Sequence, residues 1–459
     1  MARFVNRDEE LATLEAWWQE PQGSIALVWG RRRVGKSALL GQFSIGKPTV
    51  FHVASGKPLA AELAAFAEVT AGVVDTGFRD LGSHPFTDWA DAIQTLAAAA
   101  QAPLLVVLDE FPELLKVAPT LPNELRAVWD RVKDHTQLRL LLCGSAMRVM
   151  EELQQQARPL FGRLQPKLLL HPLRPHEAAL LLPDLTPADR ALVWGLVGGM
   201  PLYLEYWNAE QSIGQNIARL FLQPGAQLLL EGDLLLADDF DQPQDVGPQV
   251  LYAIAAGKTR WAEIADAVRT KPDRALERLT TLRLVERVTP VTDDPQGSRR
   301  SVYRISDNFL NFWLSVVARH RTQIERGLGQ TILPVLLQEC SDFMGGPWEA
   351  AFRAHLTRLA LQGVLGPEVV AIGAWWSADS QTEIDAIVLA GRARTATHLG
   401  EAKWARTVDG GRIVAGLQRK AGAIPKLADQ PEYIVCARET VTPHHSLTLA
   451  VTAADIFGT

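Results

Sequence analysis

The chain has few cysteines and no pattern that would pair them. Cys143, Cys340 and Cys436 stand far apart among 459 residues, without the C-x-x-C spacing of a metal or redox site. This scarcity excludes a disulfide framework and a cysteine zinc site. Isolated cysteines of this kind are typical of reduced thiols in a cytoplasmic protein.

Long apolar runs are also missing. The longest candidate, Leu104 to Leu108, has only the length of a strand, whereas a membrane-spanning helix needs about 20 apolar residues. The first residues, Met1 to Phe4, contain no apolar stretch typical of a secretion signal. We therefore expect a cytoplasmic protein without a membrane segment.

Positive charge is not in excess, because the net charge is −6, with 47% hydrophobic and 21% charged residues. This composition is typical of a globular protein with sizeable cores. A length of 459 residues predicts about three domains of ~150 residues each. Any contact with DNA must come from local basic patches, since the surface as a whole does not attract nucleic acid.

The strongest motif present is a phosphate-binding loop of the form G-x-x-x-x-G-K-[ST]. Its residues are Gly30, Arg31, Arg32, Arg33, Val34, Gly35, Lys36 and Ser37. The apolar run Ile25 to Val28 precedes it and Ala38 to Leu40 begins a helix, which is the strand–loop–helix context that the motif needs. The glycines let successive N–H groups point at phosphate oxygens. We expect Lys36 to reach the β- and γ-phosphates of ATP and Ser37 to bind Mg²⁺.

Two carboxylates follow a second buried strand. The run Leu104 to Leu108 is typical of a parallel strand buried on both faces, and it ends in Asp109 and Glu110. Ligands of open α/β sheets lie at the carboxyl ends of strands, so Asp109 is expected to bind Mg²⁺ and Glu110 to polarise the attacking water. A further strand, Leu138 to Cys143, leads to Ser145. Ser145 is predicted to sense the γ-phosphate or orient the water; a simple strand-end turn is the alternative.

Two positions have both a functional and a structural interpretation. Arg163 follows a glycine, and it could reach the γ-phosphate of its own subunit or of a neighbour in a homo-oligomer. An ordinary surface arginine is the alternative. Asn6 is predicted to cap the first helix, with Glu9 at the capping-box position.

The order of these motifs resembles that of the archaeal-type P-loop ATPases of the STAND/AAA+ group. The resemblance covers roughly residues 1–240 and rests on Asn6-Arg7, Gly30 to Ser37, Asp109-Glu110, Gly144-Ser145, Gly162-Arg163 and Gly198 to Tyr203. It implies an α/β fold with a parallel sheet and helices on both faces, followed by a small helical lid. It also implies that the segment containing Asn6 and Arg7 lies against the adenine.

The middle of the chain reads as a winged helix after an acidic linker, Glu231 to Asp245. Helices are predicted over 249–255, 261–268 and 273–284, and strands over 285–291 and 301–305, with a polar wing at 293–300. Residues 246–305 hold eleven Lys or Arg against seven Asp or Glu. Six of these basic residues could meet DNA phosphates, namely Arg269, Lys271, Arg274, Arg278, Arg299 and Arg300. A packing module between domains is the alternative.

The C-terminal region carries a second set of charged residues. A helix is predicted from Pro347 to about Leu361, followed by strands over 369–376, 383–389 and 398–404. Asp385 and Glu401 fall on adjacent strands, and Lys403 shares the strand face of Glu401 because side chains alternate. Two carboxylates can hold Mg²⁺ or Mn²⁺, with Glu349 from the helix completing the shell and Lys403 beside the scissile phosphate. The helix around residues 418–420 could touch the substrate backbone.

This arrangement is similar to the PD-(D/E)xK nuclease superfamily over residues ~345–440. The sequence departs from the pattern because Glu383-Ile384, and not a proline, precedes Asp385. The alternatives are an exposed pair of charged strands, or a nuclease fold that only binds DNA.

The sequence thus predicts four segments: a P-loop ATPase core over 1–175, a helical lid with acidic linker over 176–245, a winged helix over 246–320, and a nuclease-like α/β domain over 321–459. The leading hypothesis is ATP-gated cleavage or processing of DNA, with a role in defence against foreign DNA or in DNA processing. The alternative is an ATP-driven switch for assembly, whose C-terminal domain binds DNA or a partner without cutting.

Overall fold

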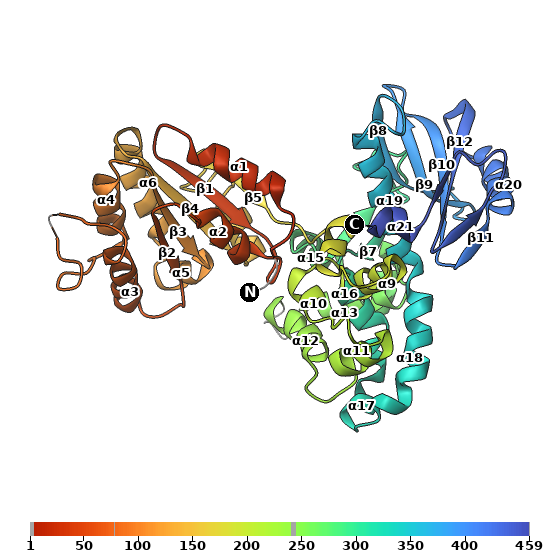
Figure 1. The fold of residues 1–459 in the computed structure, drawn as a ribbon, viewed down its shortest axis with the longest axis horizontal. Helices are drawn as coiled ribbons and strands as arrows, with labels where there is room; N and C mark the ends of the chain where they lie inside the picture. Colours follow the sequence, from red (N-terminus) through yellow and green to blue (C-terminus); the bar gives the residue numbers. More distant parts are fainter. Residues whose placement is uncertain (1–3, 78, 240–244, 459) are drawn as a thin grey trace. The chain divides into compact units, whose positions relative to one another are not determined.

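The computed structural model describes residues 4–77, 79–239 and 245–458. The chain divides into two compact units, Met1–Pro172 and Leu173–Thr459. Figure 1 shows the course of the chain through both. In the described part of the chain, none of the helices combines the length and the apolar character that crossing a membrane requires.

The first unit is built on a five-stranded, all-parallel sheet in the order β2-β3-β4-β1-β5. The strands are β1 Ser24–Trp29, β2 Thr49–Val53, β3 Leu104–Asp109, β4 Leu138–Gly144 and β5 Leu164–Leu169. Every residue of β3 and β4 is buried, as expected for strands covered on both faces. The predicted parallel α/β architecture of this unit is therefore confirmed.

Helices flank this sheet (Figure 1). They are α1 Asp8–Trp18, α2 Lys36–Ser44, α3 Leu59–Ala71, α4 Trp89–Ala99, α5 Phe111–Val117, α6 Leu121–Val132, the 3₁₀ turn η1 Lys133–His135 and α7 Met147–Glu152. The prediction that Asn6 caps α1 was wrong. Arg7 is the residue before the helix, in a left-handed conformation with φ 75°, and no side chain caps the helix end.

The second unit begins with helices and short 3₁₀ turns. These are α8 Pro175–Ala178, η2 Ala179–Leu181, α9 Pro187–Val197, α10 Pro201–Glu205, α11 Ile213–Phe221 and α12 Gln227–Asp239. The acidic linker predicted from Glu231 is helical as far as Asp239, and residues 240–244 lie outside the described residues. The prediction failed because Glu231 is buried and its carboxylate accepts a hydrogen bond of 2.7 Å from the Tyr203 hydroxyl.

Three helices and a two-stranded antiparallel ribbon follow, close to the predicted positions. They are α13 Gly247–Ala255, α14 Trp261–Val268, α15 Asp273–Thr281, β6 Val285–Val288 and β7 Val302–Ile305. We call residues 285–305 the ribbon. The chain then continues through α16 Asn308–Ser315, η3 Val317–His320, α17 Arg321–Glu325, α18 Gly329–Phe343 and α19 Gly345–Leu361.

A mixed sheet ends the chain, in the order β14-β12-β10-β9-β8. Its elements are β8 Val369–Trp376, β9 Glu383–Ala390, β10 Thr395–Lys403, β12 Leu427–Ala437 and β14 Leu449–Val451, with β11 Thr407–Asp409, α20 Gly410–Ala421, β13 Thr440–Thr442 and α21 Ala453–Phe457 around them. Strands β8, β9 and β10 pair antiparallel, whereas β10, β12 and β14 pair parallel. The α19 residues Trp348 and Phe352 pack on one side of the sheet, and the α20 residues Val414 and Leu417 belong to a second core cluster.

Candidate functional sites

The first candidate site lies at the carboxyl edge of the parallel sheet. β4 pairs with both β1 and β3, so the loop after β1, the carboxylates after β3 and the turn after β4 come together at this edge. Gly30 approaches the neighbouring backbone so closely that a Cβ there would lie 2.7 Å from the Leu170 carbonyl oxygen. A side chain at position 30 would therefore push the phosphate-binding loop off the sheet.

Lys36 opens α2 and its side chain is buried. Its ammonium donates to the carbonyl oxygens of Gly30 at 3.0 Å and Arg31 at 3.2 Å. Burial lowers the pKa of Lys36, while Glu110 and Asp109 act to raise it. Val34 is buried under the same loop and Arg32 is exposed. The lysine is thus held within the loop, where phosphate oxygens could replace the two carbonyls.

Ser37 and Asp109 are in direct contact. The Ser37 hydroxyl donates to Oδ2 of Asp109 at 2.7 Å, and the other oxygen of Asp109 accepts from the Glu110 amide at 2.9 Å. Asp109 is only 2% exposed. A hydroxyl and a carboxylate are the hard oxygen donors that Mg²⁺ takes beside nucleotide phosphates, so this donor set fits the predicted ion.

Glu110 and Ser145 also meet at this edge. The Ser145 hydroxyl donates to Oε2 of Glu110 at 2.9 Å, and the Ser145 amide lies 3.4 Å from the same oxygen. Glu110 itself has a left-handed backbone, with φ 52°. The structure thus brings Lys36, Ser37 and both predicted carboxylates into one site, and Ser145 orients Glu110.

Arg163 is engaged elsewhere. Its guanidinium forms a two-pronged pair with Asp130 of α6, at 2.8 Å and 2.7 Å. This hydrogen-bonded pairing raises the pKa of Arg163. No contact among the described residues links it to Lys36 or Glu110, so its role as an arginine finger stays a prediction.

Arg7 has a structural contact that the sequence pattern did not indicate. Its buried guanidinium donates to the carbonyl oxygens of Val34 at 3.1 Å and His171 at 2.8 Å, and it pairs with Glu10 at 2.9 Å. Asn6, beside it, is half-buried with φ 55°. The segment therefore braces the phosphate-binding loop, and its contact with adenine stays a prediction.

The second candidate site lies where β9 and β10 carry Asp385, Glu401 and Lys403. The Lys403 ammonium lies 2.8 Å from Oε1 of Glu401 and 3.6 Å from Oδ2 of Asp385. That Asp385 oxygen also accepts from the Ala402 amide at 2.8 Å. The three side chains predicted to act together are therefore in contact.

Two residues of α19 join this cluster. Arg353 donates to the Asp385 carbonyl oxygen at 2.8 Å and lies 3.5 Å from a Glu349 oxygen. Burial raises the pKa of Glu349, and the charge of Asp385 raises it further. Burial also raises the pKa of Asp385, with Glu401 as the next cause. The carboxylates are thus close enough to repel one another.

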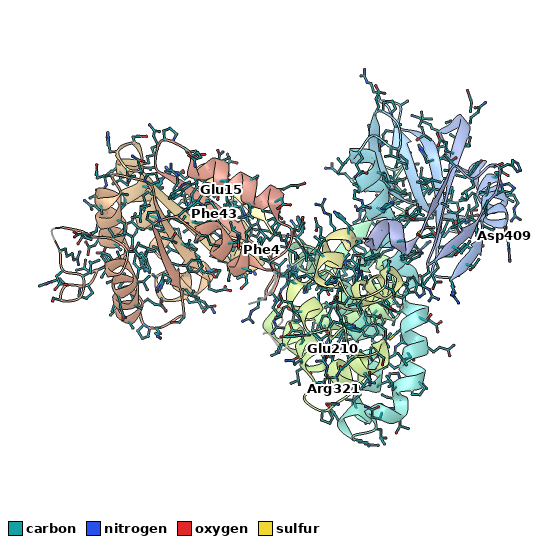
Figure 2. All side chains as sticks on the ribbon, in the orientation of Figure 1. Phe4, Glu15, Phe43, Glu210, Arg321 and Asp409 are labelled. Atoms are coloured by element: carbon teal, nitrogen blue, oxygen red, sulfur yellow. The ribbon has the colours of Figure 1, made fainter. Side chains whose placement is uncertain are left out.

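Lys420 is a member of this cluster that the sequence pattern did not assign to Glu401. Its ammonium lies 3.2 Å and 2.9 Å from the two oxygens of Glu401. Lys420 is on α20, whose first turn is capped by Asp409 through a 3.0 Å hydrogen bond from the Arg412 amide; Asp409 is labelled in Figure 2. Only the fold brings α20 over β10, so no local spacing could have identified the pair.

The donor chemistry of this second site fits a hard divalent ion, since its acceptors are carboxylate oxygens. Within the described ranges, however, no three His, Cys, Asp or Glu side chains converge tightly enough to hold a metal ion. Glu349, Asp385 and Glu401 are neighbours whose role as metal ligands stays a prediction.

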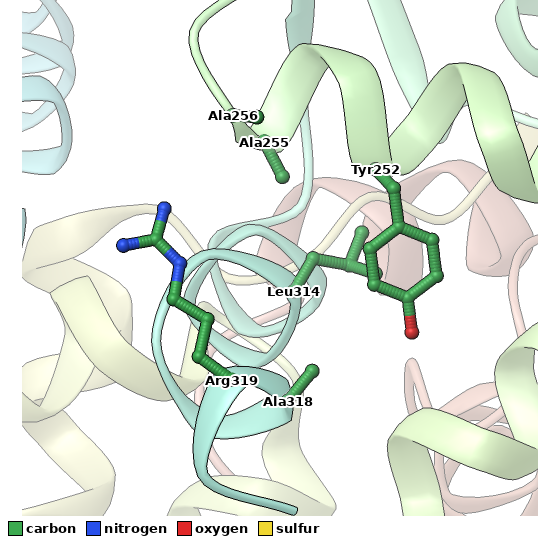
Figure 3. Close-up of a pocket in the computed structure, with 6 residues that line it drawn as sticks. All are labelled: Tyr252, Ala255, Ala256, Leu314, Ala318 and Arg319. Carbon is green, nitrogen blue, oxygen red and sulfur yellow. The ribbon is translucent and has the colours of Figure 1, made fainter. Parts of the chain in front are cut away.

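A shallow depression of about 170 Å³ lies elsewhere in the second unit, between α13 and the α16–η3 segment. Figure 3 shows the residues that line it, which are Tyr252, Ala255, Ala256, Leu314, Ala318 and Arg319. This lining contains no carboxylate and a single cation. It therefore lacks the groups that phosphate chemistry needs.

Comparisons with known proteins match two parts of the chain. Residues 4–207 match the profile of a family described as an ATPase domain predominantly from Archaea. Residues 313–413 match a family described as archaeal and bacterial proteins of unknown function. With the geometry of the phosphate-binding loop, the first match supports ATP binding and hydrolysis by this protein.

Individual relatives are similar to different shares of the chain. An uncharacterized protein of Methanocaldococcus jannaschii, MJECL04, is 24% identical over 410 residues, which cover 87% of each chain. The uncharacterized ATP-binding protein MJ0423 of the same organism is 50% identical over 40 residues, 9% of this chain and 68% of its own. The solved structure of the Walker-type ATPase PABY2304 of Pyrococcus abyssi aligns with a TM-score of 0.52 at 19% identity, over 68% of this chain and 96% of that one. This last likeness concerns the fold alone.

Proposed function

We propose that this ATP-binding and hydrolysing protein is also a metal-dependent deoxyribonuclease, whose C-terminal site cuts the DNA backbone under the control of ATP. The observation that carries the proposal is the direct contact of Lys403 with both Asp385 and Glu401. These side chains come from adjacent strands, so the sheet holds their spacing.

The chemistry at this site would divide between the ion and the protein. Asp385 and Glu401 are the residues that would hold Mg²⁺ or Mn²⁺, with Glu349 as a further donor. A divalent ion bound there supplies Lewis-acid polarisation and a water molecule of lowered pKa. Burial acts to lower the pKa of Lys403, but Asp385 and Glu401 raise it above its usual value. Lys403 therefore stays charged and can stabilise the negative charge that develops on the phosphate.

At the nucleotide site, the residues around the phosphate-binding loop would bind ATP and position the attacking water. Lys36 would exchange its two carbonyl partners for phosphate oxygens, and Ser37 and Asp109 would hold Mg²⁺. Glu110, oriented by Ser145, would polarise the attacking water. DNA is the partner that this proposal names.

A DNA-cleavage assay tests the proposal. Linear, circular and branched DNA are incubated with Mg²⁺ or Mn²⁺, with and without ATP, using wild type, Lys403→Ala and Lys426→Ala. Lys426 is a matched control because it is exposed and, within the described part of the chain, its ammonium hydrogen-bonds only to the Ala393 carbonyl oxygen, at 3.2 Å. Cleavage that is lost in Lys403→Ala and kept in Lys426→Ala supports the nuclease. Intact ATPase activity with no cleavage by wild type in any condition contradicts it.

One observation favours a second function. Lys420 occupies both oxygens of Glu401, and a lysine in that position neutralises the site without a metal ion. In this alternative the protein is an ATP-driven switch whose C-terminal region binds DNA or a partner without cutting. The same assay separates the two, because a switch would bind DNA and leave it intact.

A further inference from the structure

The ribbon is fastened to the edge of the C-terminal sheet. The Val291 amide donates to the Ala374 carbonyl oxygen of β8 at 2.9 Å. Arg300 donates to the Trp376 carbonyl oxygen at 2.8 Å, and Arg394 donates to the Val291 carbonyl oxygen at 2.9 Å. A Cβ at Gly373 would lie 3.0 Å from the Val291 side chain, so the two segments are in close contact. The ribbon, which includes the predicted wing, is therefore bound to the C-terminal sheet of the same chain.

The ribbon is attached to β8 close to the carboxylate cluster of Glu349, Asp385 and Glu401. In the β8–β9 register, Trp375 pairs with Ile384, the residue before Asp385. The hydrogen bond from Val291 reaches β8 one residue away, at Ala374. The ribbon therefore meets the sheet beside the second candidate site.

Arg304, on β7, is a ribbon residue whose charge reaches that site. It stands opposite Glu286 in the ribbon and is half-buried. Its positive charge acts on both Glu349 and Arg353 of α19. Among the described residues, the side chain of Arg304 has no hydrogen-bond or ion-pair partner, and only its backbone takes part in the β6–β7 ladder. By contrast, Arg300 is paired with Asp293.

The other cations near the cluster are already engaged. Arg353 contacts Glu349 and the Asp385 backbone, Lys403 contacts two carboxylates, and Lys420 holds Glu401. With Arg304, four cations face the three carboxylates, so the site has a formal excess of one positive charge. Arg304 is the one of these four cations whose side chain forms no ion pair or hydrogen bond with the cluster.

We propose that Arg304 binds a phosphate of the DNA backbone next to the bond that is cut, so that the ribbon and the C-terminal sheet form one composite DNA site. This inference rests on the proposed function and names a substrate-binding residue for it. An arginine suits the role because its planar fork can donate two parallel hydrogen bonds to one phosphate, whereas the ammonium of a lysine is a point charge without that fixed geometry.

Binding can be measured apart from cleavage. A short fluorescein-labelled duplex is titrated with the full-length protein in EDTA, and fluorescence anisotropy is recorded over a range of salt concentrations. The proteins are wild type, Arg304→Ala, Arg304→Lys and Arg326→Ala. Arg326 is the matched control, because it is an exposed arginine that follows α17 and belongs to neither the ribbon nor the C-terminal sheet. Circular dichroism checks that each variant is folded, and Arg304→Lys keeps the test available if Arg304→Ala does not fold.

We expect Arg304→Ala to bind on the order of tenfold more weakly, and the slope of log K against log salt to fall by about 0.9, the value for one lost phosphate contact. Arg304→Lys should recover part of the affinity, and Arg326→Ala should behave like wild type. An unchanged affinity and slope in Arg304→Ala would overturn the inference, as would a wild type that does not bind the duplex. Binding that depends on Arg304 without any cleavage by wild type would support Arg304 and refute the nuclease.

Discussion

The Lys36 ammonium is held within the phosphate-binding loop because it donates hydrogen bonds to the Gly30 and Arg31 carbonyl oxygens. In these bonds only the donor is charged, so they are weaker than bonds to phosphate oxygens, in which the acceptor carries the opposite charge. We therefore expect Lys36→Ala to weaken ATP binding by roughly 10- to 100-fold, the equivalent of about 1.5–3 kcal/mol for lost bonds to a charged group. Isothermal titration with a non-hydrolysable ATP analogue measures this.

The control for that measurement is Lys116→Ala. Lys116 lies on α5 with a side chain that is 68% exposed, and Glu113 is its ion-pair partner. Its removal should leave nucleotide affinity unchanged. Equal affinity in wild type and Lys36→Ala would contradict the assignment of the loop as a phosphate site.

Single residues also show which parts of the candidate sites could be predicted from the sequence and which could not. The P-loop and Asp109-Glu110 could be predicted because each motif is contiguous and its strand context is local. The bond from Arg7 to the His171 carbonyl oxygen spans 164 residues, and the contact from Lys420 to Glu401 spans 19 residues and needs α20 to cross β10. Partners of this kind depend on the fold, so no spacing rule reveals them.

Helix α19 contains a pH-sensitive contact. Its His355 is buried, and Nδ1 lies 3.1 Å from an Arg358 nitrogen. A guanidinium can only donate, so Nδ1 must accept and the imidazole must be neutral. Burial, with the nearby charge of Arg358, lowers the pKa of His355 from 6.5 to about 4.

The sign of the pH effect follows from that lowered pKa. As the pH falls below 6.5 the unfolded chain takes up a proton that the folded chain refuses until about 4, so stability is lost on acidification. We expect the free energy of unfolding of the second unit to drop by about 2 kcal/mol between pH 7 and pH 5 from this group. Urea unfolding followed by tryptophan fluorescence at the two pH values measures it.

The variant His355→Gln should flatten this dependence, because glutamine can still accept from Arg358 and does not titrate. His445→Gln, at an exposed position, should keep the wild-type profile. If His355→Gln loses as much stability on acidification as wild type, His355 is not the source.

Elements were predicted well where the sequence carried an alternating or helical pattern. The predicted strand over residues 369–376 coincides with β8, and the strand from Glu383 differs from β9 only at its end. The segment from Glu231 was assigned to a linker on composition alone, yet α12 continues through it because Glu231 bonds Tyr203 inside the unit. Composition alone cannot show that an acidic residue is buried when its hydrogen-bond partner is distant in the sequence.

At the scale of the whole molecule, the proposal requires the two sites to act in sequence. Lys36→Ala should remove any stimulation of DNA cleavage by ATP and leave the basal cleavage unchanged. Glu110→Gln should bind ATP and hydrolyse it at least about 100-fold more slowly, as expected when a general base is removed.

Comparing cleavage by these two variants shows what ATP contributes. If nucleotide binding is the signal, Glu110→Gln keeps the stimulation that Lys36→Ala loses. A wild type whose cleavage is the same with and without ATP would show that the sites work independently. Gel assays of DNA cleavage, run beside phosphate-release measurements, provide the comparison.

The contact of Val291 with Ala374 has a consequence for handling this protein in pieces. β8 is the last strand of its sheet, and an uncovered outer strand offers its amides and carbonyls to any other chain that can add to it. A fragment that starts after residue 305 lacks the segment that bonds to Ala374. In such a fragment β8 would be an exposed edge strand that can pair with other copies of the fragment. Recombinant fragments of the C-terminal region should therefore begin before the ribbon if they are to stay monodisperse.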